Sequence, residues 1–419
     1  MARLLFKQNK IKKSKDDSKF HIAIAPVIAM AQCFSMFPVV GIFSKDAQKI
    51  RFKFLSFRTF MAASWFVSVI IFLWFEILRI ASYEKINAKN VSSLIFYIIG
   101  TITAINFYKL AFKWNNFMQL NKEVEDIFLS HPYSLSGWSL KMRIRVTAFL
   151  IMMLALIEHL FSWYSYLYER IYQAEVCKWE IGSWFYYILS LHLSHIYLHF
   201  PVNIFTVTWA EYMNISLTFS WSFIDLFIML MAISISSRFK MLNERLDFFK
   251  GRIVTDEFWD NIRCHYNKLC ELNENVDKIL GNLICIASLS DLYYVCLQLL
   301  NVATRMPFFA NKIYFWYSLI FLICRTFTLF ILTAQIHDES IKSLAIYRTL
   351  PTEGWFNSTQ RLCEQIQRSG VALSGKNFFF LTRGLIISIA GTIITYELVL
   401  LQFDNDKIVS DLFNITCPH

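Results

Sequence analysis

Seven apolar stretches, each about as long as a bilayer is thick, constrain this sequence more than any other feature. A hydrocarbon core of about 30 Å needs about 20 mostly apolar residues in a helix. Each stretch here holds at most two ionisable side chains, in a chain that is 56% hydrophobic. We therefore predict an all-α polytopic membrane protein with seven transmembrane helices. The stretches are Thr59–Phe75, Val91–Tyr108, Val146–Tyr168, Ile215–Ser237, Ile279–Leu300, Ile313–Gln335 and Gly384–Phe403.

An eighth stretch, Ser183–Trp209, is also apolar enough to cross a membrane, but Pro201 interrupts it. Counting it as a span would place the basic segment Arg238–Lys278 outside the cell, whereas cytoplasmic loops usually carry the excess of Lys and Arg. We therefore predict an extracellular lid at about 171–212. Seven spans and a Lys-rich start then give a cytoplasmic N-terminus and an extracellular C-terminus.

The orientation of the spans assigns each connecting segment to one side of the membrane. Residues 238–278 and 336–380 mix charged residues with apolar ones at helical spacing, which predicts long cytoplasmic helices that could form a collar between subunits. The expected order is a cytoplasmic segment 1–53, helices 1–4 with the lid in 54–237, a cytoplasmic extension 238–278, helices 5–6 in 279–335, a cytoplasmic helical segment 336–380, helix 7 in 381–404 and an extracellular tail 405–419.

Several classes of function find no support in the sequence. It contains no P-loop, no HExxH, no GxSxG and no dinucleotide fingerprint, so we expect no enzyme and no cofactor. The net charge of +10 follows from the basic cytoplasmic loops, and no nucleic-acid-binding motif accompanies it. Membrane lipid is the expected environment, and nucleic acid is not an expected partner.

Ionisable residues inside the predicted spans point to a ligand site, because each is costly in lipid unless it faces a cavity or a partner. Carboxylates accept hydrogen bonds from paired hydroxyls, and a Trp ring stacks on the C–H face of a sugar. The predicted ligand-binding residues share helix sides in the outer half of the bundle and are Glu158, His159, Trp163, Trp221 and Asp225. Two alternatives remain: the charges form internal salt bridges, such as Arg325 with Asp291, or the rings anchor the helices at the interface.

Two further patterns lie on the predicted outer side. His192, His195 and His199 lie at helical spacing in the lid, where a polar outer surface is the expected role and no metal site is predicted. The sequons of Asn90, Asn214 and Asn414 fall outside and are glycosylation candidates.

In the last span, Thr395, Val399 and Gln402 fall at i, i+4 and i+7 on one face. This narrow stripe of a hydroxyl, a small apolar side chain and an amide could line a conduction path, with the apolar position gating by dewetting. A helix-packing seam would show the same pattern.

The same span carries a family motif. Thr395-Tyr396, five residues, and then Gln402-Phe403 resemble the TY(x)5QF signature of insect gustatory receptors. TYELVLLQF resembles in particular the sugar-receptor clade, as do the segment AQCFSMFPVVGI at 31–42 and WSFIDLF around Asp225. The resemblance extends over essentially the whole chain.

The resemblance implies a ligand-gated cation channel in the plasma membrane of sensory neurons. It implies a homotetramer, or a heterotetramer with related receptor subunits, whose seventh helices line the pore and whose subunits each hold a sugar in an extracellular-facing pocket. The motif residues Thr395, Tyr396, Gln402 and Phe403 carry over as pore residues, with Val399 the expected constriction. A G-protein-coupled receptor and a secondary sugar transporter are the alternatives. The chain lacks the DRY triplet and the NPxxY motif of G-protein-coupled receptors. It also lacks the internal repeat of secondary transporters.

Overall fold

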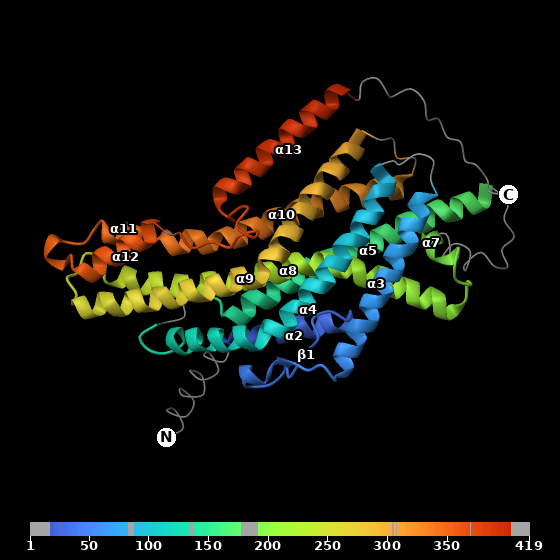
Figure 1. The fold of residues 1–419 in the computed structure, drawn as a ribbon. Helices are drawn as coiled ribbons and strands as arrows, with labels where there is room; N and C mark the ends of the chain where they lie inside the picture. Colours follow the sequence, from blue (N-terminus) through green and yellow to red (C-terminus); the bar gives the residue numbers. More distant parts are fainter. Residues whose placement is uncertain are drawn as a thin grey trace, which may run out of the picture.

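The computed structural model describes residues 17–82, 88–133, 137–176, 192–303, 306, 308–368 and 370–403, and this part of the chain is almost entirely helical (Figure 1). A short antiparallel pair of strands, with Val39 opposite Phe52, is its sheet. The helices are α2 (Phe20–Cys33), α3 (Phe57–Ala81), α4 (Ala88–Phe128), α5 (Leu140–Val176), α7 (Ser194–Tyr197), α8 (Ile204–Phe248), α9 (Asp256–Leu300), α10 (Phe309–Ile341), α11 (Leu344–Tyr347), α12 (Asn357–Arg368) and α13 (Arg383–Phe403). The strands are β1 (Val39–Val40) and β2 (Arg51–Phe52), and the 3₁₀ turns are η1 (Ala47–Lys49), η3 (Asn301–Ala303) and η4 (Thr352–Gly354).

Each of the seven predicted apolar stretches lies within one of these helices. Six of the helices are long and apolar enough to cross a membrane, namely α3, α4, α5, α8, α9 and α10. The seventh, α13, has 21 residues, and its part up to Thr395 qualifies as a shorter apolar helix. Within the predicted lid, the described residues form the last turns of α5, the short helix α7 and the first turns of α8.

Helix α8 is the centre of the bundle. Nearly all of its most apolar window is buried, as expected for a helix that is apolar on every side. It packs against α5, α9 and α10. Its start is fixed by a capping box. The Asn203 side chain accepts hydrogen bonds from the backbone N–H groups of Phe205 and Thr206, each at 3.0 Å, and the Thr206 hydroxyl accepts one from the backbone N–H of Asn203.

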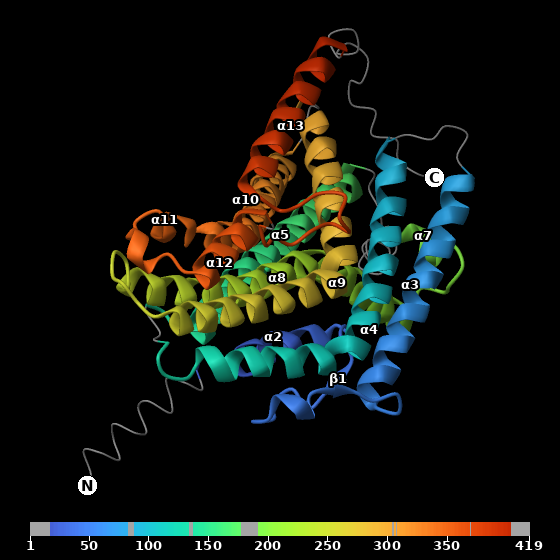
Figure 2. The ribbon, with the colours of Figure 1, turned by 60° about the vertical axis from the view of Figure 1, so that its left-hand side comes forward.

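The helices α8 and α9 each run for 45 residues, which is about 68 Å at 1.5 Å per residue and more than twice the thickness of a bilayer core. Their joined ends extend past the other helices to the tip where α11 and α12 lie (Figures 1 and 2). The predicted long extensions of the fourth and fifth spans are thus present as continuous helices. The collar between subunits stays a prediction.

The N-terminal part was predicted as one cytoplasmic segment, 1–53, and it contains more structure than that. Helix α2 lies beside α5 and α8, and its Phe20 is fully buried. The Phe20 N–H donates to Glu125 on α4 at 2.7 Å, and Arg238 on α8 lies 3.1 Å from the same carboxylate oxygen. Arg238 also donates to the carbonyl of Ser18 at 2.7 Å. With 14 residues, α2 is too short to appear in a search for spans.

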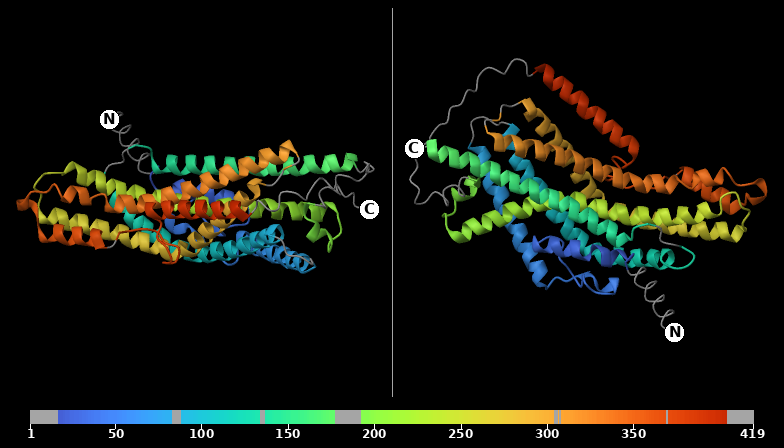
Figure 3. Two further views of the ribbon diagram at one scale, coloured as in Figure 1. Left: turned by 90° about the horizontal axis from the view of Figure 1, so that it is seen from above. Right: turned by 180° about the vertical axis from the view of Figure 1, so that it is seen from behind.

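Helix α13 stands at the edge of the molecule, next to α9 and α10 at one end and diverging from them at the other (Figures 1 and 3). Its Ile387 and Ile394 are 76% and 60% exposed. An apolar helix with so little cover in the single chain needs lipid or another subunit around it.

Candidate ligand site and the last helix

Three spans meet at a buried charge cluster around Arg325 of α10. Its Nε lies 2.7 Å from Oδ2 of Asp225 on α8, and its Nη2 lies 3.4 Å from Oδ1 of Asp291 on α9. All three side chains are at most 1% exposed. Arg325 also donates to the Ser222 hydroxyl at 2.8 Å. The predicted ion pair of Arg325 with Asp291 is therefore present, and Asp225 joins it, so one cation holds two acids.

Trp221 packs on this cluster. It lies one helical turn before Asp225, and its ring centre is 4.6 Å from the guanidinium carbon of Arg325. Tyr294 of α9 also packs on Trp221, with 5.0 Å between ring centres. The indole N–H of Trp221 is buried and has no hydrogen-bond partner among the described residues. Such a donor is costly when left unpaired and is suited to bind a ligand hydroxyl.

Glu158 of α5 is 8% exposed and accepts a 2.5 Å hydrogen bond from the hydroxyl of Ser318 on α10. Ser318 in turn accepts a 3.1 Å bond from the side-chain amide of Gln298 on α9. The carbonyl oxygen of Gln298 is buried and unpartnered within the described part of the chain. Side chains of α5, α10 and α9 therefore form a series of hydrogen bonds, which ends at the unpaired carbonyl oxygen of Gln298 in the described residues.

A further acid, Glu211, lies near the start of α8. His192 Nδ1 lies 3.5 Å from its Oε1, and both of its carboxylate oxygens are buried without a hydrogen bond in the described residues. His159 interacts electrostatically with Glu211 and His192 and also has an unpartnered Nε2. The ring of Trp163 packs on His192 at 4.8 Å. Acceptors, donors and a Trp ring thus lie together near the start of α8.

The three histidines predicted to form a polar outer surface differ in exposure: His199 is exposed, His192 is half-buried and His195 is buried. His195 is 7% exposed, with Nε2 3.3 Å from the Tyr97 hydroxyl and Nδ1 3.8 Å from Glu76. Burial lowers the pKa of His195 to about 4, although the nearby Glu76 acts in the opposite direction. His199 stacks on Phe75 with 4.3 Å between ring centres. The described residues contain no group of three or more side chains that could hold a metal ion.

The five predicted ligand residues lie in two groups. Trp221, Asp225 and Glu158 lie around Arg325, and Asp225 already has a protein partner there. His159 and Trp163 lie with Glu211 and His192. Glu211 was missed, although it is the single acidic residue between Glu180 and Asp225 and could have been found on that ground. Direct contact of any of these residues with a ligand stays a prediction.

The predicted pore residues lie on α13. Thr395 is exposed and its hydroxyl donates to the Gly391 carbonyl at 2.9 Å. Tyr396, Val399, Gln402 and Phe403 continue the helix, but their side chains lie outside the described residues. Of the sequons, Asn214 is half-buried within α8, Asn90 is in the first turn of α4, and Asn414 lies outside the described residues.

An apolar gap of 190 Å³ separates α13 from α9 and α10. It is lined by Thr326 and Phe330 on one side and by Ile386, Ile389 and Ile393 on the other. Thr326 also donates a 3.0 Å hydrogen bond to Asp291. The buried charge cluster thus reaches the face that meets the last helix.

The arrangement of the helices is that of a known class of membrane receptor. The insect olfactory receptor OR5 from Machilis hrabei superposes with a TM-score of 0.64 at 15% identity, over 91% of this chain and 99% of that one. OR5 in complex with eugenol gives 0.61 at 14% identity, over 94% and 98%. This chain therefore has the fold of the insect olfactory receptors, a polytopic helical membrane fold.

Sequence comparison gives the family. The family model described as trehalose receptor matches residues 6–417. The gustatory receptor for sugar taste 64a of Drosophila melanogaster is 34% identical over 92% of this chain and 84% of its own length. The gustatory receptor 5a for trehalose of the same fly is 30% identical over 93% and 86%. The chain belongs to the trehalose-receptor family, among the sugar gustatory receptors, and the predicted resemblance is confirmed.

Proposed function

We propose that this protein is a sugar-gated, non-selective cation channel in the plasma membrane of gustatory neurons. Its family membership and its olfactory-receptor fold support this function. The observation that carries the proposal is the set of buried polar atoms on Glu211, His159, Trp221 and Gln298 that have no hydrogen bond in the described residues, together with the ring contacts of Trp163 with His192 and of Trp221 with Tyr294. Sugars offer hydroxyls to such atoms and C–H faces to such rings.

In this proposal the sugar lies between the two groups of predicted ligand residues. The carboxylate of Glu211 accepts hydrogen bonds from two hydroxyls, while the indole N–H of Trp221 and Nε2 of His159 contact others. The Trp163 ring covers an apolar face of the sugar. Asp225 acts through Arg325, whose position under the Trp221 ring it fixes at 2.7 Å.

The site connects to the last helix through consecutive contacts. Trp221 packs on Arg325 at 4.6 Å, Arg325 pairs with Asp291 at 3.4 Å, and Asp291 accepts a bond from Thr326 at 3.0 Å. Thr326 faces α13 across the apolar gap. A sugar that binds more tightly to the open state, and moves Trp221 when it does so, shifts Thr326 against α13. Such a chain of contacts is a coupling route only if its members prove energetically coupled.

The pore itself is proposed from the motif on α13. Four copies of α13, in a homotetramer or with related subunits, surround a central path, with Val399 at the constriction and Thr395 and Gln402 facing the ions. The exposed apolar surface of α13 in the single chain supports an assembly in which other subunits cover it. The cytoplasmic N-terminus, the extracellular C-terminus and the cytoplasmic collar belong to the same proposal.

The test is sugar-evoked current in a cell that lacks gustatory receptors, with candidate partner subunits supplied and surface expression measured. Glu211→Gln and Glu158→Gln each remove one carboxylate charge. A hydrogen bond to a charged group is worth about 1.5–3 kcal/mol, so the sugar concentration for half-maximal current should rise by about 10- to 100-fold at a ligand contact. Glu175→Gln is the matched control, since Glu175 is exposed at the end of α5.

A chain that reaches the surface but gives no current with any sugar, with partners present, would refute the channel proposal. Sugar uptake without current would favour a transporter instead. If Glu211→Gln, Glu158→Gln and Asp225→Asn all respond like Glu175→Gln, the channel can stand but the site is wrong.

A further inference from the structure

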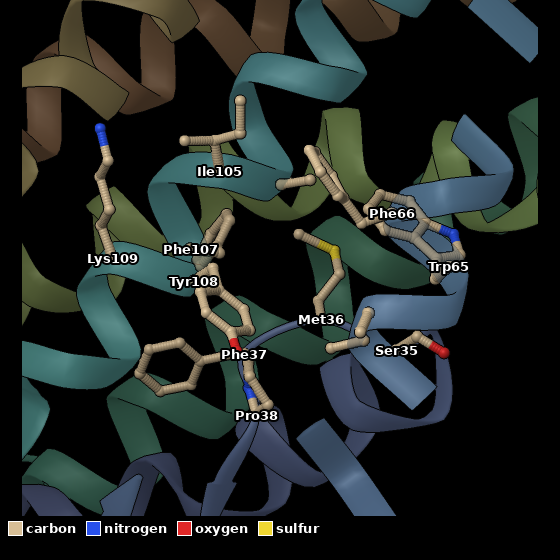
Figure 4. A pocket seen from close by; sticks show the side chains of 13 residues that line it. Ser35, Met36, Phe37, Pro38, Trp65, Phe66, Ile105, Phe107, Tyr108 and Lys109 are labelled. Atoms are coloured by element: carbon tan, nitrogen blue, oxygen red, sulfur yellow. The ribbon is translucent and has the colours of Figure 1, made fainter. Parts of the chain in front are cut away.

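A second cavity, of 350 Å³, lies between α3, α4 and the loop that joins α2 to β1 (Figure 4), near the start of α3. Trp65 and Phe66 of α3 line one side, Ile105 and Phe107 of α4 line another, and Met36 of the loop closes it from below (Figure 4). This volume lies within the range of roughly 300–1,000 Å³ that small-molecule sites occupy.

The walls of this cavity are almost wholly apolar, and two of their polar groups already have protein partners. The indole N–H of Trp65 donates to Ser216 on α8, and the Ser35 hydroxyl lies 2.9 Å from the hydroxyl of Tyr212. Lys109 is the charged residue of the lining; it is exposed, stands at the edge of the group in Figure 4, and has no acid partner among the described residues. A sugar would find few hydrogen bonds here, but an apolar chain with an anionic end would match both features.

The cavity opens on the outer flank of the bundle. Ala63, Ile105 and Lys109 at its mouth are exposed. Phe52 of β2 packs beside the mouth on Tyr108, with 5.5 Å between ring centres. The surrounding surface carries exposed apolar side chains that the described residues leave uncovered: Phe43, Phe54, Leu55, Phe57 and Phe60, which are 68–93% exposed.

Basic residues accompany these apolar side chains. Lys49, Arg51 and Lys53 are exposed, and none has an ion-pair partner in the described part of the chain. Asp46 is the single acid between Lys19 and Arg58. Bulky apolar residues beside unpaired basic ones are typical of a surface that lies in the headgroup region of an anionic leaflet.

We infer that this cavity is a binding site for an anionic phospholipid of the inner leaflet. One acyl chain enters between α3 and α4, and the phosphate-bearing headgroup lies against Lys109 and the basic β2 strand. This placement in the inner leaflet rests on the cytoplasmic N-terminus of the proposed function. The lipid would hold the β1–β2 hairpin, the start of α3 and α4 together.

The test uses the full chain reconstituted in vesicles of equal amounts of phosphatidylcholine and phosphatidylserine, then re-extracted in mild detergent, with the retained phospholipid measured by mass spectrometry. The wild type should retain phosphatidylserine in preference to phosphatidylcholine. Lys109→Gln should lower the retained phosphatidylserine about fivefold, since one Lys near an anionic surface contributes about that factor. Lys250→Gln is the matched control, because Lys250 is exposed in the turn after α8.

Ala63→Phe places a ring in the mouth and should lower the retention of both lipids, whereas Ala81→Phe at the other end of α3 should not. Equal retention of the two lipids by the wild type, or retention by Lys109→Gln and Ala63→Phe equal to that of their controls, would overturn the inference. Lipid retention is measured without sugar or current. A result that overturns the lipid site therefore leaves the channel proposal intact.

Discussion

Replacing Arg325 with glutamine should destabilise this protein far more than replacing either of its acid partners. Arg325 faces Asp225 at 2.7 Å and Asp291 at 3.4 Å, and none of the three side chains is more than 1% exposed. At an effective dielectric constant of about 20, each contact corresponds to an attraction of about 5–6 kcal/mol before desolvation is subtracted. Arg325→Gln leaves two uncompensated carboxylates, and breaking a buried pair in this way costs about 3–5 kcal/mol.

Asp225→Asn has a different result because it leaves one cation facing one acid. Arg325 keeps Asp291 at 3.4 Å and can still bond to the amide oxygen of the new side chain. The expected loss is about 1.5–3 kcal/mol, that of one hydrogen bond to a charged group. The triple variant Arg325→Gln, Asp225→Asn, Asp291→Asn removes all three charges and should recover much of the stability lost in Arg325→Gln.

The assay is thermal unfolding of the detergent-solubilised full chain, followed by fluorescence-detected size-exclusion chromatography, together with the amount of protein at the cell surface. Arg325→Gln should have the lowest unfolding temperature, with the triple variant above it and Asp225→Asn closest to the wild type. If Arg325→Gln is as stable as Asp225→Asn, or the triple variant is no better than Arg325→Gln, the charge balance of this cluster does not hold the three helices together.

Two further predictions concern the lid and its junction with α8. Asn203→Ala removes the N-cap of α8 and should cost about 1 kcal/mol, visible as faster amide hydrogen exchange confined to residues 204–208; Thr208→Ala, in an exposed position of the same turn, should leave that exchange unchanged. The pKa of His195 is about 4 in the folded chain and about 6.5 when unfolded. Below about pH 6.5 the unfolded state therefore binds a proton that the folded state resists, so stability falls as pH falls. Between pH 7 and pH 5 the loss should reach about 2 kcal/mol in thermal unfolding, and His195→Gln should lose this pH dependence; an equal dependence in both proteins would contradict it.

The spans and their order could be predicted from the sequence because the bilayer imposes a length and a polarity on each crossing segment. Thr59–Phe75 and Ile313–Gln335 lie within α3 and α10 for this reason. The mixed-charge residues 238–278 still repeat their apolar positions at helical spacing, which is why the long extensions of α8 and α9 were also predictable. Helix α2 was missed, since it is stabilised by its packing and by the Glu125 and Arg238 contacts, which no local pattern reveals.

For the candidate site, the sequence by itself determined which ionisable and aromatic residues lie inside the bundle, because each is anomalous in an apolar span. The sequence could not show which side chains pair with these residues. Asp225 and Glu158 looked equivalent, yet Asp225 pairs with Arg325 from another helix while Glu158 bonds to Ser318. The contacts of Glu211 and of the histidines in the predicted lid follow only from the packing of α7 against α3 and of α5 against α8. Periodicity along one helix fixes which face a side chain occupies, but what stands opposite that face depends on how distant helices pack, and only the tertiary structure decides that.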